Sequence, residues 1–152
     1  MSKLIIKPNG YYEGIVKCLY AGNEGEVIAF LQEMYQANIV FPFEKEQYEF
    51  LKQLYQDDIE HTKRLAEILV IMGADPKYLN VQNMWISGKS IDYVKSYKQM
   101  LYCNLELKEK TIIDYKTAIN KISDKNINMI LNLNLEDEIL HKKMIIRQIE
   151  LL

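Results

Sequence analysis

Apolar residues recur every three or four positions through most of the chain, a spacing that places them on one face of a helix. In the second predicted helix, for example, the apolar stripe runs from Leu51 to Met72. Only 6 Gly and 3 Pro occur in 152 residues, which favours long uninterrupted helices. The pattern predicts four of them, over residues 21–40, 44–72, 90–122 and 124–151.

Helix-breaking and capping residues separate these segments. Pro42 ends the first helix, Gly73 ends the second, and Ser123 or Asp124 caps the fourth. The connection from Gly73 to about Gly88 is long enough to cross from one end of a bundle to the other. The predicted fold is therefore all-α: an antiparallel four-helix bundle in up-down-down-up order, with a long crossover between helices two and three.

We expect the chain to form a single domain over residues 1–152, which is long enough to bury one core. A Pro-Asn-Gly cluster at positions 8–10 predicts that residues 1–10 form an irregular N-terminal arm. A short helical piece over residues 11–20 is expected to follow it.

Charge and composition argue against several classes of function. The formal net charge of −2 gives no strong attraction to nucleic acid, and the apolar runs are too short to span a membrane. We expect neither partner. Cys18 and Cys103 stand alone, so no thiolate metal site is encoded. Two lone thiols without a secretion signal indicate a cytoplasmic protein.

Two carboxylate-x-x-His motifs lie on the apolar faces of the second and fourth predicted helices. They pair Asp58 with His61 and Glu138 with His141, and they contain both histidines of the chain. Each pair is about one helical turn apart on the same face. Buried ionisable groups are costly unless something satisfies them. A metal ion is the commonest such partner for a carboxylate and an imidazole.

Ionisable residues also lie in the stripes of the first and third predicted helices. Glu26 and Glu33 are one heptad apart in the first, and Lys108 lies seven residues before Tyr115 in the third. Glu109 would replace Lys108 on the inner face only if the register were shifted by one residue, which the periodicity argues against. Tyr115 is a candidate redox-active phenol, although we favour a packed tyrosine with a hydrogen-bonded hydroxyl.

This layout resembles the ferritin-like superfamily, in particular its short bacterial rubrerythrin-like and manganese-catalase-like members. The matching segments are residues 21–26, 58–65, 72–78, 112–115 and 138–141. The resemblance covers nearly the whole chain from Ala21 onward. It implies one Glu from each of helices one and three, and one Glu-x-x-His from each of helices two and four. Together these ligands hold two iron or manganese ions in the bundle core. The four-cysteine rubredoxin module of true rubrerythrins is absent from the sequence.

Carried over position by position, the resemblance implies that Glu26, His61, Glu138 and His141 are metal ligands. Asp58 stands where the family has Glu, so it keeps the charge with a side chain one methylene shorter. Asp58 and Glu138 are then expected to bridge or flank the ions.

Two departures from the family pattern leave the number of ions open. Glu33 stands where many members have Tyr, and Lys108 stands where helix three supplies its Glu, unless Glu109 takes that place. The four inward carboxylates carry −4 and Lys108 carries +1, which leaves −3. One divalent ion would bring this sum to −1 and two would bring it to +1. Charge alone therefore permits one, two or no ions.

Two functions follow from these alternatives. The first is an iron- or manganese-binding protein, and whether it is an enzyme stays uncertain. If it is one, it is an oxidoreductase that acts on peroxide, oxygen or ferrous iron. The second is a metal-free bundle in which Lys108 is the internal counter-ion and the surface serves as a structural or binding module. An outward apolar stripe on the first helix, which includes Ile28, Leu31, Tyr35 and Ile39, predicts a homodimer.

Overall fold

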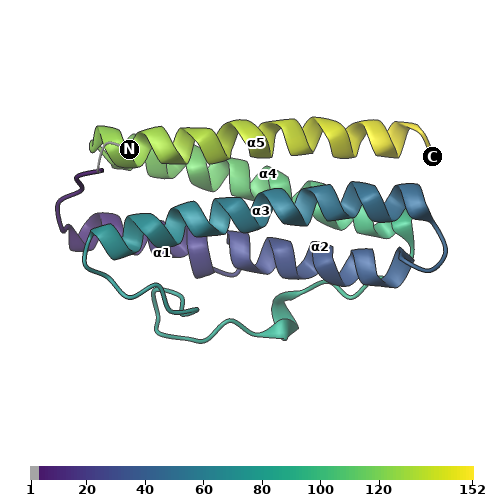
Figure 1. Ribbon diagram of the computed structural model, residues 1–152, viewed down its shortest axis with the longest axis horizontal. Coiled ribbons are helices and arrows are strands. Elements are labelled where there is room, and N and C mark those ends of the chain that lie inside the picture. The colour runs from purple at the N-terminus through teal and green to yellow at the C-terminus, as the bar shows by residue number, and fades with distance from the viewer. Residues whose placement is uncertain (1–3) are drawn as a thin grey trace.

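The computed structural model describes residues 4–152, which form helices joined by loops. The helices are α1 Gly10–Ala21, α2 Glu26–Val40, α3 Lys45–Ile71, α4 Tyr97–Lys121 and α5 Lys125–Glu150, with a short 3₁₀ turn, η1, at Gly88–Ser90. The short helix α1 was expected over residues 11–20. It lies end to end with α2 along one edge of the molecule (Figure 1).

The bundle consists of two antiparallel hairpins, α2 with α3 and α4 with α5. Residues 72–96 form a crossover along the outside of the bundle, which returns the chain to the end where α3 begins (Figure 1). Because of this return, α3 and α4 run parallel to each other. The predicted four-helix bundle with a long second connection is confirmed. Within the described range, no helix combines the length and the apolar character that a membrane span requires.

The start of α2 differs from the sequence prediction. It begins at Glu26 rather than near Ala21, because the chain breaks at a loop that contains Gly22. A Cβ added at Gly22 would lie 2.4 Å from the carbonyl oxygen of Cys18, so the close approach requires glycine. The break places Glu26 in the first turn of α2.

Capping residues explain the starts of the last two helices. The sequence predicts that the third helix begins near Ser90, but α4 begins at Tyr97. The Ser96 side chain accepts a hydrogen bond from the Gln99 amide and so caps the helix at this point. The residues before Ser96 belong to the crossover, which is therefore longer than expected. Asp124 caps α5, as one of the two predicted alternatives.

The crossover packs against part of the outward face of α2. Ile28 is 2% exposed, and the ring of Tyr35 packs edge-on against Tyr93 of the crossover with 4.8 Å between centroids. The amide of Asp92 donates a hydrogen bond to Gln32 Oε1 at 3.0 Å. The apolar stripe from which a homodimer is predicted is therefore partly covered: Ile28 is buried, whereas Leu31, Tyr35 and Ile39 remain partly exposed. The homodimer stays a prediction, which sedimentation velocity at micromolar concentration would test.

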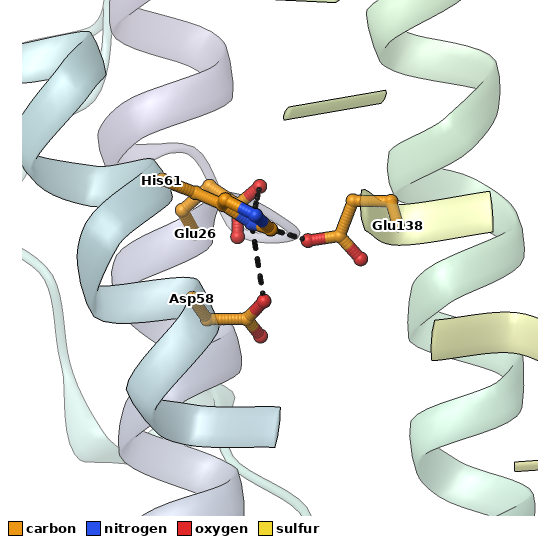
Figure 2. A group of neighbouring side chains, drawn as sticks. All are labelled: Glu26, Asp58, His61 and Glu138. Carbon is orange, nitrogen blue, oxygen red and sulfur yellow. Dashed lines mark hydrogen bonds and ion pairs between the residues drawn. The ribbon is translucent and has the colours of Figure 1, made fainter. Parts of the chain in front are cut away.

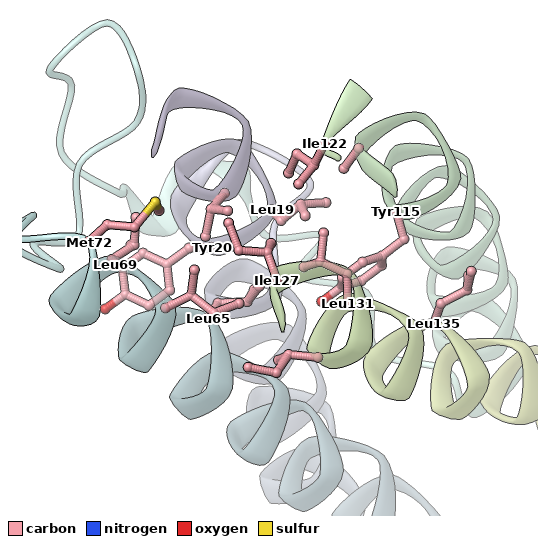
Figure 3. Close-up of a cluster of buried hydrophobic side chains, with 14 of the residues drawn as sticks. Leu19, Tyr20, Leu65, Leu69, Met72, Tyr115, Ile122, Ile127, Leu131 and Leu135 are labelled. Atoms are coloured by element: carbon pink, nitrogen blue, oxygen red, sulfur yellow. The ribbon is translucent and has the colours of Figure 1, made fainter. Parts of the chain in front are cut away.

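Two apolar clusters fill the bundle, one toward each end. The larger cluster contains Leu65, Leu69 and Leu131 and includes residues of α1 (Figure 3). The smaller cluster contains Leu54 and Leu101 near the other end. On each long helix most of the buried side chains between the two clusters are polar or charged. The core is therefore interrupted at mid-bundle by a polar layer.

Candidate metal centre

The polar layer is built from all four bundle helices. Its central members, each at most 1% exposed, are Glu26 and Glu33 from α2, Asp58 and His61 from α3, Lys108 and Tyr115 from α4, and Glu138 and His141 from α5. A spacing of three or seven residues keeps both members of each pair on the inner face of their helix. The sequence prediction that these side chains converge in the core is therefore correct.

His61 lies among three carboxylates. Its Nδ1 atom is 3.0 Å from Glu138 Oε1, 3.3 Å from Asp58 Oδ1 and 3.4 Å from Glu26 Oε1. Figure 2 shows the three carboxylates pointing toward this side of the ring from α5, α3 and α2. One ligand atom from each of the four residues lies within 4.8 Å of all the others. This spacing is compatible with four ligands around one ion.

Lys108 forms the second half of the layer. Its Nζ atom is 3.1 Å from Glu33 Oε1, 3.1 Å from Glu138 Oε2, and in close contact with Asp58 Oδ2. A buried ammonium thus contacts one carboxylate from each of α2, α3 and α5. It occupies the inner position on α4 at which the resemblance described above implies a glutamate.

Asp58 and Glu138 connect the two halves. Each directs one carboxylate oxygen toward His61 Nδ1 and the other toward Lys108 Nζ. Each of the two carboxylates therefore lies between the imidazole of His61 and the ammonium of Lys108. A carboxylate that bridges two cations is placed in the same way.

His141 lies at the edge of the layer, near one carboxylate oxygen from each half. Its Nδ1 atom is 3.6 Å from Asp58 Oδ1 and 3.8 Å from Glu138 Oε2, and it has no hydrogen-bond partner within the described residues. The ring is 5.8 Å from that of His61, centroid to centroid. The two histidines thus face the same carboxylates without contacting each other.

The alternative register for α4 is wrong. The Glu109 side chain is 49% exposed and lies 3.9 Å from Lys142 on the surface. Successive residues of a helix point in different directions around its axis. Because Lys108 points into the core, Glu109 points away from it. Glu109 is therefore not a member of the candidate centre.

Two carboxylates that the sequence analysis did not single out hold the outer nitrogens of the histidines. His61 Nε2 is 3.0 Å from Asp137 Oδ2, and His141 Nε2 is 2.9 Å from Asp57 Oδ2. Each Asp comes from the opposite helix, so α3 and α5 are paired reciprocally. The signal was present in the sequence, because Asp57 and Asp137 each directly precede the carboxylate of a motif.

Tyr115 is hydrogen-bonded within the layer, in agreement with the packed alternative. Its hydroxyl donates to Glu26 Oε1 at 2.7 Å and accepts from Asn134 Nδ2 at 3.1 Å. Arg64 Nη1 donates in turn to Asn134 Oδ1 at 3.1 Å. A chain of hydrogen bonds therefore leads from Glu26 to the half-exposed Arg64.

A buried ladder of amides, also not anticipated, lies next to the Lys108 half. Gln32 Nε2 donates to Asn104 Oδ1 at 2.9 Å, and Asn104 Nδ2 donates to Gln36 Oε1 at 2.6 Å. Asn104 is one turn before Lys108 on α4. The ladder fixes the rotation of α4 against α2, and hence the direction in which Lys108 enters the core.

Burial and mutual repulsion shift two carboxyls toward their neutral forms. Burial, reinforced by the charges of Glu138 and Asp58, raises the pKa of Glu26 to about 8. Burial also raises the pKa of Glu33 well above its usual range, and the neighbouring Asp58 adds to this effect. In the metal-free chain these carboxyls therefore hold protons at a pH where exposed glutamates have lost them.

Close partners keep the other groups charged despite their burial. Burial by itself would lower the pKa of Lys108, but the carboxylates of Asp58 and Glu138 raise it well above its usual value. Burial would raise the pKa of Glu138, but Lys108 holds it well below its usual range. Burial opposes the charge of His61 too, yet Glu26 and the other carboxylates raise its pKa far above the ordinary value.

The donor atoms fit a divalent transition-metal ion. Glu26 Oε2 and Asp58 Oδ1 are buried without a hydrogen-bond partner within the described residues, and such orphaned acceptors are rare in folded proteins. Carboxylate oxygen and imidazole nitrogen are ligands that suit iron and manganese. Glu26, Asp58, His61 and Glu138 would hold such an ion.

The bundle, its crossover and this buried acidic layer define a ferritin-like protein fold. A crystal structure of wild-type KatB, a manganese catalase from Anabaena, has a TM-score of 0.88 to this chain, with 17% sequence identity over 97% of this chain and 74% of that one. A second structure, of KatB from Anabaena PCC7120, also has a TM-score of 0.88, with 16% identity over the same shares of both chains. At this identity the likeness establishes the fold alone. No protein-family model matches the sequence, and no curated protein is significantly similar to it.

Proposed function

We propose that this protein binds iron or manganese at mid-bundle, through Glu26, Asp58, His61 and Glu138. The observation that carries the proposal is the convergence of these four buried residues, whose ligand atoms all lie within 4.8 Å of one another. Carboxylates this close repel one another in a medium of low dielectric, and a divalent cation removes that repulsion.

The hydrogen bonds around His61 support its role as a ligand. Its Nδ1 atom faces the carboxylates, and its Nε2 atom lies 3.0 Å from Asp137. A metal-bound histidine commonly donates its outer N–H to a carboxylate, which fixes the ring orientation and strengthens the ligand. The ring is therefore already oriented for a metal on its inner side.

We propose further that the protein is an oxidoreductase acting on peroxide, oxygen or ferrous iron. A bound iron or manganese ion would supply the redox chemistry at such a site. The chain's own residues contribute apolar packing on both sides of the layer, which limits water, and Tyr115, which donates a hydrogen bond to Glu26. The free thiols of Cys18 and Cys103 support a reducing compartment, and we propose the cytoplasm.

Elemental analysis tests the metal assignment. The protein purified without chelator, and the chelated protein reloaded with Mn²⁺ or anaerobic Fe²⁺, should contain near-stoichiometric metal. Glu138→Gln removes a ligand charge at the centre, and Glu109→Gln makes the same chemical change on the surface of α4. We expect metal loss in the first variant and wild-type content in the second. Equal loading of both variants would disprove the assignment.

The contacts of Lys108 favour a second candidate function. Its ammonium already contacts Glu33, Asp58 and Glu138, so a metal-free bundle can balance part of the central charge internally. Such a protein would be a structural or binding module that acts through its surface. In that case reloading leaves no bound metal, and chelator does not change the thermal midpoint of unfolding.

A further inference from the structure

We infer that the centre holds one divalent ion in each chain, and that the ammonium of Lys108 permanently takes the place of a second one. This inference rests on the proposed metal binding and specifies it. It concerns the number of ions, which neither the fold nor the charge sum determines.

The positions of the carboxylate oxygens carry the argument. Glu138 places Oε1 3.0 Å from His61 Nδ1 and Oε2 3.1 Å from Lys108 Nζ. Asp58 divides its two oxygens between the same partners. The two linking carboxylates therefore have one pair of oxygens available for an ion held by His61. Lys108 Nζ already contacts the other pair.

Lys108 also has a third carboxyl partner at the position that a second ion would take. Glu33 Oε1, from α2, lies 3.1 Å from Lys108 Nζ and is directed at the ammonium rather than at His61. The ammonium thus has a carboxylate partner from each of three helices, as an ion at this point would have. Its side chain is 1% exposed, so it has no room to leave for the solvent without reorganising the core.

A second ion would have to share these carboxylates with a buried ammonium beside it. Like charges in contact at low dielectric repel strongly, and the helix that would supply another carboxylate supplies Lys108 instead. His141 is not one of the four residues whose ligand atoms lie within 4.8 Å of one another, although its Nδ1 atom is buried without a hydrogen-bond partner within the described residues. In the wild-type chain His141 is therefore a neighbour of the centre, and it becomes a ligand only when Lys108 is replaced by a carboxylate.

Counting bound Mn²⁺ tests the inference. Native mass spectrometry and equilibrium dialysis should give one Mn²⁺ per wild-type chain, with the hyperfine-split paramagnetic resonance signal of an isolated ion. Lys108→Glu should bind two, with the altered signal of two coupled ions. Lys110→Glu, the same change at a half-exposed lysine of α4 that pairs with Glu24 and Glu106, should still bind one.

A pair of histidine variants keeps the inference testable if Lys108→Glu does not fold. His61→Ala should lose the bound ion, whereas His141→Ala should retain one. Two ions in the wild-type chain, one ion in a folded Lys108→Glu, or loss of the ion in His141→Ala would each overturn the inference and leave the proposed metal binding intact. No ion in the wild-type chain would overturn the proposed function itself.

Discussion

The Nε2 atom of His61, on α3, lies 3.0 Å from Oδ2 of Asp137, on α5. Asp137 is 46% exposed, whereas His61 is fully buried, so a surface carboxylate fixes the orientation of a ring in the core. His141 and Asp57 repeat this relationship with the helices exchanged. Only the first of these pairs, by our inference, supports a residue that binds metal.

Asp137→Asn should therefore weaken metal binding, because the amide no longer supplies the charge that strengthens His61 as a ligand. Loss of such a supporting group typically lowers metal affinity by about 10- to 100-fold. Competition with a chelator of known affinity measures the change. Asp57→Asn is the matched control, and we expect it to bind Mn²⁺ nearly as tightly as the wild type. Equal effects of the two variants would contradict the unequal roles of the histidines.

Lys108→Met should strongly destabilise the metal-free chain. The substitution leaves the carboxylates of Asp58 and Glu138 buried without their common counter-ion, and it removes the contact of the ammonium with Glu33. Removing one partner from a buried ion pair costs about 3–5 kcal/mol. Urea unfolding in the presence of chelator, followed by circular dichroism, measures the free energy. Lys110→Met, which affects a half-exposed lysine paired with Glu24 and Glu106, should change this free energy far less. A metal-free Lys108→Met as stable as the wild type would show that the ammonium is not needed as counter-ion.

Tyr115→Phe should lower the free energy of unfolding by about 1–2 kcal/mol, because it removes a buried hydrogen bond to Glu26 and leaves Asn134 without its hydroxyl partner. The same denaturation assay measures the loss. Tyr93→Phe, at a tyrosine that is 51% exposed, should stay within about 0.5 kcal/mol of the wild type. A Tyr115→Phe chain with unchanged stability would mean that this hydrogen bond contributes nothing net.

Stability should fall in alkali, in part because of Tyr20. Its hydroxyl donates to the carbonyl oxygen of Pro76, and burial raises its pKa from 10.0 to about 12. The folded chain thus holds this proton where the unfolded chain has released it. The contribution of the protonated Tyr20 hydroxyl to the free energy of unfolding is complete below pH 10 and is lost as the pH rises toward 12.

Tyr20→Phe cannot ionise, so its stability relative to the wild type should improve between pH 9 and pH 12, by on the order of 1 kcal/mol after allowance for solvent screening. Urea titrations across this pH range measure the difference. Tyr11→Phe, at an exposed tyrosine of the same helix, should run parallel to the wild type. Parallel curves for Tyr20→Phe as well would assign the alkaline loss to other groups.

The sequence by itself determined which residues enter the core. Helical periodicity is a local property, so the spacing of Asp58 to His61, and of Lys108 to Tyr115, was enough to place them on inner faces. The same argument correctly separated Lys108 from Glu109. Helix ends were less predictable. The start of α2 depends on the contact of Gly22 with the preceding helix, which periodicity does not report.

Only the tertiary structure decided how these residues meet. The pairing of Asp57 with His141 and of Asp137 with His61 depends on the axial offset between α3 and α5, and that offset is fixed by packing along the whole length of both helices. The division of the Glu138 oxygens between a histidine and a lysine has the same origin. The sequence pattern also could not predict that the crossover packs against α2. An apolar stripe has the same sequence pattern whether a loop of the same chain or a partner protein covers it.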